Sequence, residues 1–122
     1  MARAVRQPIL VVEDDEVISS TIELFLREEG YPVMVADNGK AALERAAELS
    51  PCLILLDMKM PAMDGWAFAA SYRQRPGPHA PIIVMTAAQD SRTRAIEINA
   101  EGWIAKPFDV EHLLELVHRF AS

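Results

Sequence analysis

The sequence lacks the features that mark secreted, membrane-spanning and metal–thiolate proteins. Cys52 is its only cysteine, so neither an intramolecular disulfide nor a cluster of thiolate ligands can form. The apolar runs stay far below the roughly 20 residues of a transmembrane helix, and residues 1–7 have no apolar stretch behind them of signal-peptide length. We therefore expect a cytoplasmic protein without membrane contact.

Positive charge is also scarce. The chain has 12 Lys and Arg against 18 Asp and Glu, which gives a net charge of −6, and its basic residues are scattered. Binding to the phosphates of nucleic acids needs a basic face. No direct nucleic-acid partner is therefore expected.

The composition is that of one ordinary globular domain. Apolar residues make up 51% of the 122 residues, which is typical of folded proteins. A chain of this length fits a single domain. We predict one that spans residues 1–122, with its core at about residues 8–121.

Short apolar runs alternate five times with longer amphipathic stretches. The runs predict strands at residues 9–12, 32–36, 53–56, 82–85 and 102–105. Helices are predicted to begin near residues 17, 39, 66, 91 and 109, and the fourth is a weak one that reaches residue 100. Strands that are apolar on both faces are typical of parallel sheets covered by helices on both sides. The pattern therefore predicts an open, doubly wound α/β fold whose ligand crevice lies at the carboxyl ends of the strands.

Polar groups follow four of the five predicted strands. They are, in chain order, Glu13-Asp14-Asp15, Asp57, Thr86 and Lys106. Carboxylates that meet in one crevice raise each other's pKa unless a cation is present. Mg²⁺ suits such a place because it binds one or two carboxylates together with phosphate oxygens, and a lysine and a hydroxyl can bind further phosphoryl oxygens.

Each of these residues also has an ordinary structural interpretation. An Asp after a strand commonly belongs to a turn or a helix cap, and Asp14 and Asp15 can be acids of a first helical turn, which the helix dipole favours. Thr86 can be a cap and Lys106 a solvated surface residue. Only their joint position at four strand ends favours a phosphoryl site.

Four segments together resemble the response-regulator receiver domain of two-component signalling. They are Ile9-Leu-Val-Val-Glu-Asp-Asp15, Leu55-Leu-Asp-Met-Lys-Met-Pro-Ala-Met-Asp-Gly65, Met85-Thr-Ala87 and Lys106-Pro-Phe108. The resemblance covers nearly the whole chain. It implies a flavodoxin-like fold, in which a parallel sheet with the strand order 2-1-3-4-5 is surrounded by five helices.

The resemblance implies a phosphoacceptor and a set of metal ligands. Asp57 is expected to be the phosphoacceptor. Asp14 and Asp15 would be the acidic pair that holds Mg²⁺ with Asp57, where Asp15 binds the ion directly and Asp14 acts largely through water. The backbone carbonyl of Lys59 would complete the protein ligands, and Mn²⁺ is a possible substitute for Mg²⁺.

Further residues are expected to respond to the phosphoryl group. Thr86 resembles the switch hydroxyl of the family, and the small Ala87 beside it leaves space for the group to enter. Lys106 would pair with the phosphoryl group. Trp103 takes the position of the switch aromatic, and the Lys106–Pro107 bond is expected to be cis.

The implied function is that of a phosphorylation-dependent switch. The chain would accept a phosphoryl group from a sensor histidine kinase or a histidine phosphotransfer protein. It would then present a changed surface of the fourth helix, fifth strand and fifth helix to an unidentified downstream protein, as a monomer or a weak phosphorylation-dependent dimer. It would catalyse only its own phosphorylation and dephosphorylation, and is otherwise not an enzyme.

Three alternatives stay open at this point. The chain can be an intermediate in a phosphorelay, or a receiver-like interaction module that is never phosphorylated, although such a module has no physical need for a repulsive acidic cluster. A phosphatase or phosphotransferase of the haloacid-dehalogenase type would need a second Asp two residues after Asp57, where this chain has Lys59.

Two departures from the family pattern affect these expectations. Lys59 occupies a position that flanks the path of the hydrolytic water in the family, which leaves the lifetime of the phosphoryl group open. The segment of residues 86–106 is slightly shorter than is common. A trimmed or tilted fourth helix is therefore expected.

Overall fold

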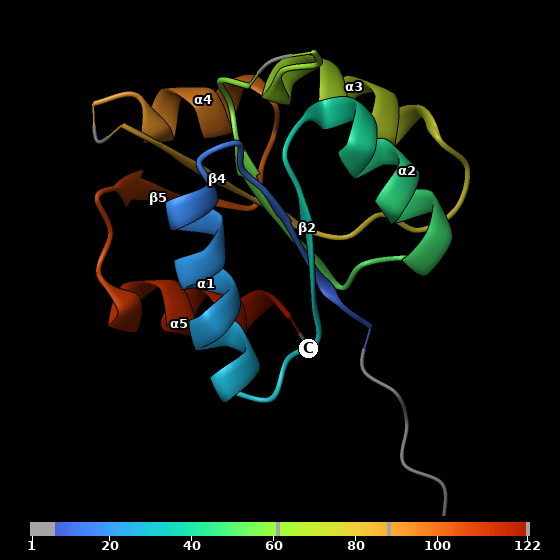
Figure 1. Ribbon diagram of the computed structural model, residues 1–122. Helices are drawn as coiled ribbons and strands as arrows, with labels where there is room; N and C mark the ends of the chain where they lie inside the picture. The colour runs from blue at the N-terminus through green and yellow to red at the C-terminus, as the bar shows by residue number, and fades with distance from the viewer. Residues whose placement is uncertain (1–6, 61, 88, 122) are drawn as a thin grey trace, which may run out of the picture.

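The structure is a computed structural model that describes residues 7–60, 62–87 and 89–121. The predicted alternation of strands and helices is present in full (Figure 1). The elements are β1 (Ile9–Val12), α1 (Glu16–Glu28), β2 (Val33–Ala36), α2 (Gly39–Leu49), β3 (Leu53–Asp57), α3 (Gly65–Gln74), β4 (Ile82–Ala87), α4 (Ser91–Glu97), β5 (Gly102–Lys106) and α5 (Val110–Phe120). Both ends of the predicted domain, residues 1–6 and 122, lie outside the described residues. Pro61, in the loop after β3, also lies outside them.

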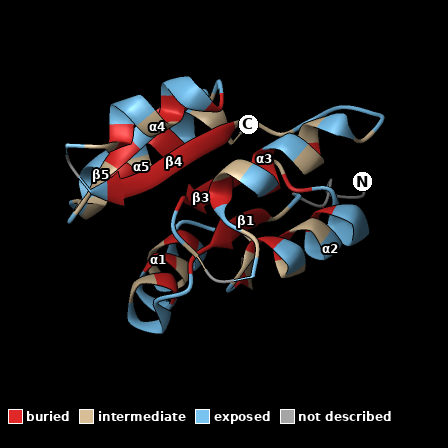
Figure 2. Cartoon of the chain, turned by 90° about the horizontal axis from the view of Figure 1, so that it is seen from above, coloured by how far each residue is buried: buried red, intermediate tan, exposed pale blue. Residues whose placement is uncertain are grey.

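The five strands form one parallel sheet in the order β2-β1-β3-β4-β5, which confirms the predicted fold class. Helices α1 and α5 pack against one face of the sheet, and α2, α3 and α4 pack against the other. Figure 2 shows the buried strands lying between these two helical layers. No helix among the described residues is long and apolar enough to cross a lipid bilayer.

The two helical layers explain why β1 is apolar at every position. Side chains of a strand point alternately to the two faces of the sheet. In β1, Leu10 and Val12 pack with α2 and α3, whereas Ile9 and Val11 pack with α1 and α5. Because both faces are covered, no position in this strand is left for a polar side chain.

Helix α4 ends earlier than predicted. It spans Ser91–Glu97, and the expected continuation to residue 100 is wrong. The chain leaves the helix at Ile98, and Asn99 has a φ of 53°, a left-handed conformation that commonly ends helices and that asparagine tolerates. Helix α4 therefore has seven residues.

Candidate functional site

The register of the sheet brings the predicted site residues to one edge. Val12 pairs with Leu56, so Glu13 follows β1 at the level where Asp57 closes β3. Asp57 pairs in turn with Met85, one residue before Thr86. On the next strand, Ala87 pairs with Lys106. Strands β3 and β5 each run one residue further than predicted, so Asp57 and Lys106 belong to the sheet itself.

Three carboxylates meet at the ends of β1 and β3. Glu13, Asp14 and Asp57 each offer an oxygen atom, and these oxygens all lie within 4.8 Å of one another. Asp57 is 6% exposed and Glu13 2%, whereas Asp14 is exposed. Burial and the Glu13 carboxylate raise the pKa of Asp57 to about 6, although Lys106 and a hydrogen bond from the Lys59 backbone oppose the rise. The cluster therefore carries the uncompensated negative charge that a cation relieves.

Lys106 supplies part of the missing positive charge. Its Nζ contacts Oε1 of Glu13 and lies 3.7 Å from Oδ1 of Asp57. Its side chain is 21% exposed, so the ammonium faces the crevice while its stem is largely covered. The next peptide bond, Lys106–Pro107, is cis as the resemblance implies.

Asp15 lies outside the acidic cluster, so the structure does not bring it together with the other predicted metal ligands. Its Oδ1 accepts hydrogen bonds from the backbone N–H groups of Val17 at 2.9 Å and Ile18 at 3.2 Å, and so it caps α1. Its own backbone N–H donates to Oε2 of Glu13 at 3.1 Å. Glu13 thus takes the place in the cluster that the sequence-based assignment gives to Asp15.

A sequence signal for this arrangement exists. Asp15 directly precedes the first helical residue, the position where Asp and Asn side chains satisfy free N–H groups. Glu13, in contrast, directly follows a fully buried strand.

Variants of the two aspartates distinguish these roles. Asp15→Ala is expected to destabilise the fold by about 1 kcal/mol because α1 loses its cap, and Asp15→Asn restores most of that loss. Asp15→Asn is expected to leave Mg²⁺ affinity unchanged, whereas Asp14→Asn weakens it by about tenfold or more. Urea unfolding and calorimetric Mg²⁺ titration measure the two effects. Equal losses of Mg²⁺ affinity in the two Asn variants would return Asp15 to the metal set.

The remaining predicted residues lie on β4 and β5 and in the loop after β3. Thr86 is buried at the end of β4 and Ala87 beside it is exposed. Trp103 lies on β5 and is 44% exposed. Trp103 and Thr86 point to the same face of the sheet, because Thr86 pairs with Ala105, two residues after Trp103. The Lys59 side chain is exposed, and the role of its carbonyl stays a prediction.

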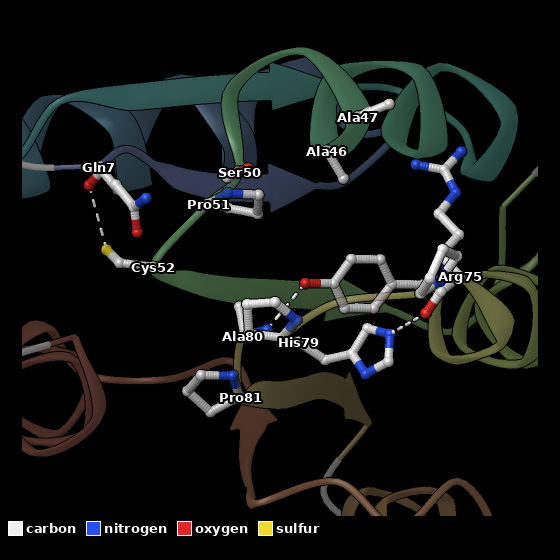
Figure 3. Close-up of a pocket in the computed structure, with 13 residues that line it drawn as sticks. Gln7, Ala46, Ala47, Ser50, Pro51, Cys52, Arg75, His79, Ala80 and Pro81 are labelled. Carbon is white, nitrogen blue, oxygen red and sulfur yellow. Dashed lines mark hydrogen bonds between the residues drawn. The ribbon is translucent and has the colours of Figure 1, made fainter.

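A groove of about 610 Å³ lies at the opposite end of the sheet, where β1, β3 and β4 begin, and is lined in part by Gln7, Cys52 and Pro81 (Figure 3). Within it, the Cys52 thiol donates to the Gln7 carbonyl at 3.2 Å, and His79 Nε2 lies 2.8 Å from the Arg75 carbonyl. None of the predicted site residues is among the residues that line this groove. The groove and the predicted phosphoryl site therefore lie at opposite ends of the sheet.

The sequence is similar to that of proteins whose family is known. Residues 9–118 match the family model described as the response regulator receiver domain. The response regulator ArlR of Staphylococcus saprophyticus is 38% identical over 108 residues, which are 87% of this chain and 48% of that protein. The chain spans about half the length, or less, of the curated relatives it matches.

Solved structures agree with the sequence relatives. The receiver domain of the sensor histidine kinase PA1611 from Pseudomonas aeruginosa, which has a magnesium ion coordinated in its active site cleft, superposes with a TM-score of 0.86 at 31% identity, covering 96% of this chain and 98% of that one. The chemotaxis protein CheY4 of Vibrio cholerae superposes with a TM-score of 0.82 at 29% identity, covering 95% and 99%. The family model matches residues 9–118, and the sheet has the strand order 2-1-3-4-5 that the sequence resemblance implies. This chain therefore belongs to the response regulator receiver domain family.

Proposed function

We propose that the chain is a phospho-accepting switch in which Asp57 takes a phosphoryl group from the phosphohistidine of a partner protein. The observation that carries the proposal is the group of three carboxylates at the ends of β1 and β3, with the Lys106 ammonium beside it. Such a cluster destabilises the fold by itself, because like charges in a partly buried place repel one another. A site that receives a cation and a phosphoryl group accounts for it.

The donor set fits Mg²⁺. Carboxylate oxygens are the ligands that this hard cation prefers, and Glu13, Asp14 and Asp57 present them within 4.8 Å of one another. These three side chains would hold the ion, with the Lys59 carbonyl as a further expected ligand, and Mn²⁺ shares the preference. When bound, the ion supplies positive charge against the phosphoryl oxygens. The magnesium ion in the cleft of the PA1611 receiver supports this assignment.

Phosphoryl transfer here needs alignment and charge more than activation of the nucleophile. One carboxylate oxygen of Asp57 forms the new P–O bond while the P–N bond to the donor imidazole breaks. The electron pair of the broken bond stays on the imidazole nitrogen, and the product is an acyl phosphate. Lys106, whose Nζ lies 3.7 Å from Asp57 Oδ1, offsets the charge on the phosphoryl oxygens.

The acyl phosphate then changes the face of the sheet that α4 covers. It adds up to about two negative charges and new acceptor oxygens. The hydroxyl of Thr86 can turn to bond one of these oxygens, which vacates space on the face where Trp103 lies. The half-exposed Trp103 ring can enter that space and so alter the surface of α4, β5 and α5.

The partners follow from this chemistry. The donor is a sensor histidine kinase or a histidine phosphotransfer protein, and the reader is a downstream protein that binds the α4–β5–α5 surface. A phosphatase activity of the haloacid-dehalogenase type is disfavoured, because Lys59 stands where such an enzyme would carry its second acid. A place within a phosphorelay uses the same Asp57 chemistry.

A small phosphoryl donor tests the proposal without knowledge of the partner. The full chain, incubated with phosphoramidate and Mg²⁺, is expected to gain the mass of one phosphoryl group, and peptide mapping places it on Asp57. Chelation of the metal with EDTA is expected to prevent the gain. Asp64→Asn is the matched control for Asp57→Asn, because Asp64 caps α3 within the same loop and asparagine keeps that cap. An unmodified chain in the presence of Mg²⁺ would leave a phosphorylation-independent interaction module as the better account.

A further inference from the structure

Helix α4 is bound to α3 by a cluster of side chains at the last turn of α4. The indole Nε1–H of Trp66, at the start of α3, donates to Oε1 of Glu97 at 2.9 Å. The guanidinium of Arg94 lies 5.3 Å from the centroid of the Trp66 ring, within the range of a cation–π contact. Arg94 Nη1 also donates to the same Glu97 oxygen at 2.7 Å. One carboxylate oxygen thus joins an arginine of α4 to a tryptophan of α3.

A second contact holds the end of α4. Arg73 lies seven residues after Trp66, which is about two helical turns, so both side chains project from one side of α3. Arg73 donates to the backbone carbonyl of Ile98, and its Nη2 donates to the Asn99 carbonyl at 2.9 Å. These carbonyls lie where a helix ends and have no partner within it. Arg73 therefore caps α4 from the neighbouring helix.

Helix α4 is short and depends on the elements that surround it. It has only seven residues, and Asp90 at its start makes no side-chain cap hydrogen bond. Helices this short are unstable in isolation and depend on tertiary contacts. Arg94 Nε is buried without a hydrogen-bond partner among the described residues, which offsets part of the gain from the cluster. The helix is therefore held mainly by its packing on the sheet and by α3.

Trp66 is also tied to the segment that follows the phosphoacceptor. Gly65, its neighbour, donates its backbone N–H to the Met58 carbonyl at 3.0 Å. A Cβ atom at Gly65 would lie 2.6 Å from the Met58 sulfur and 3.0 Å from the carbonyl oxygen of Asp57. The start of α3 thus sits directly against the end of β3. Trp66 therefore directly follows a residue that packs against the end of β3, while its own ring contacts α4.

We propose that Trp66 and Arg73 are positioning residues which clamp α4 to α3 and so hold the α4–β5 surface in its unphosphorylated arrangement. The clamp consists of these two residues of α3 together with Arg94 and Glu97 of α4. Its signalling consequence rests on the proposed function, because α4 belongs to the surface that the phosphoryl group is proposed to switch. The clamp links the loop after Asp57 to that surface by a route that does not pass through Thr86.

Hydrogen exchange of the full, unphosphorylated chain tests the clamp. Trp66→Phe keeps an aromatic ring but removes the N–H donor, and Arg73→Met keeps the apolar stem but removes the guanidinium. Each is expected to raise exchange in the α4 segment by about tenfold while exchange in α1 and α5 stays at the wild-type rate. Glu97→Gln keeps an oxygen acceptor for Trp66 and is expected to stay near wild type, because an exposed ion pair contributes little. Arg92→Met, at an exposed arginine of the same helix, is the matched control.

The outcomes separate the clamp from the proposed function. Unchanged α4 exchange in both variants, or a rise of similar size in all helices, would overturn the clamp, because the variants would then act on overall stability or on nothing. Phosphoryl uptake by the same variants, measured as added mass, is expected to match wild type. Failure of the wild-type chain to take up a phosphoryl group would contradict the proposed function and leave the exchange result intact.

Discussion

Replacement of Asp57 by asparagine is expected to abolish phosphoryl uptake and, at the same time, to stabilise the metal-free fold by about 2 kcal/mol at pH 7. The loss follows because an amide cannot form the acyl phosphate. The gain follows from the surroundings of Asp57, where burial and Glu13 raise its pKa from 3.8 to about 6. The folded protein thus binds the Asp57 proton more tightly than the unfolded chain does.

The direction of the pH dependence follows from that difference. A carboxyl group with a raised pKa in the folded state contributes its full stability below about pH 4, and the contribution is lost as the pH rises through about 6. Each pKa unit corresponds to roughly 1.4 kcal/mol. The expected gain in stability is smaller than the free energy that corresponds to the full pKa shift, because the buried amide of the variant also needs hydrogen-bond partners. Because that amide does not titrate, Asp57→Asn is expected to remove the decline between about pH 4 and 6.

Urea unfolding of both proteins in EDTA, at several values between about pH 4 and 7, measures the effect. The stability difference between variant and wild type is expected to grow with pH over this range. Asp37→Asn, at an exposed aspartate after β2, controls for the loss of one negative charge at a distance. A variant less stable than wild type at neutral pH would show that the surroundings stabilise the ionised carboxylate of Asp57, contrary to the structure.

Replacement of Lys106 by methionine is expected to have the opposite effect on stability and a large effect on phosphorylation. Met fills a similar volume but leaves the Glu13 and Asp57 carboxylates without their ammonium partner. Loss of one member of a buried ion pair is strongly destabilising. Because the Lys106 side chain keeps 21% of its exposure, we expect a loss of about 2 kcal/mol rather than the larger values of fully buried pairs. Phosphoryl uptake is expected to slow by about a hundredfold.

Mg²⁺ shows whether the stability loss of Lys106→Met comes from the lost charge or from altered packing. A cation that binds only the folded state stabilises it, and it also compensates the carboxylates that Lys106→Met leaves unpaired. The stability gap between wild type and variant, measured by urea unfolding, is therefore expected to narrow when Mg²⁺ replaces EDTA. Lys40→Met, at an exposed lysine of α2, is the matched control. A gap that is the same in both buffers would assign the loss to packing.

The sheet and most of the site can be predicted because their signals are local and repeated. Every buried strand is a short run of apolar residues, and Asp57, Thr86 and Lys106 follow such runs directly. The parallel register then brings the strand ends together without further information. The strand order and the cis bond before Pro107 come from the family resemblance.

The differences between the predictions and the structure have local causes too. The sequence assigns Asp15 to the metal because it is an acid in the right segment, yet a residue directly before a helix has free N–H groups to satisfy first. Helix α4 is predicted too long because Ile98 and Ala100 continue its apolar pattern. Nothing in that pattern shows that Arg73, from another helix, binds the carbonyls at which the helix stops.

The contrast between β3 and α4 has a consequence for how a signal would be kept and read. Asp57 closes a strand that is buried along its whole length and flanked on both sides by other strands of the sheet, whereas α4 is a seven-residue helix at the surface that depends on contacts with the sheet and with α3. Local opening requires little free energy in weakly packed segments and approaches global unfolding in central strands. A phosphoryl group on Asp57 would thus be bound to a strand that opens rarely and be sensed through a helix that opens more easily. A downstream protein could therefore bind, deform and release α4 repeatedly without removing the phosphoryl group from Asp57.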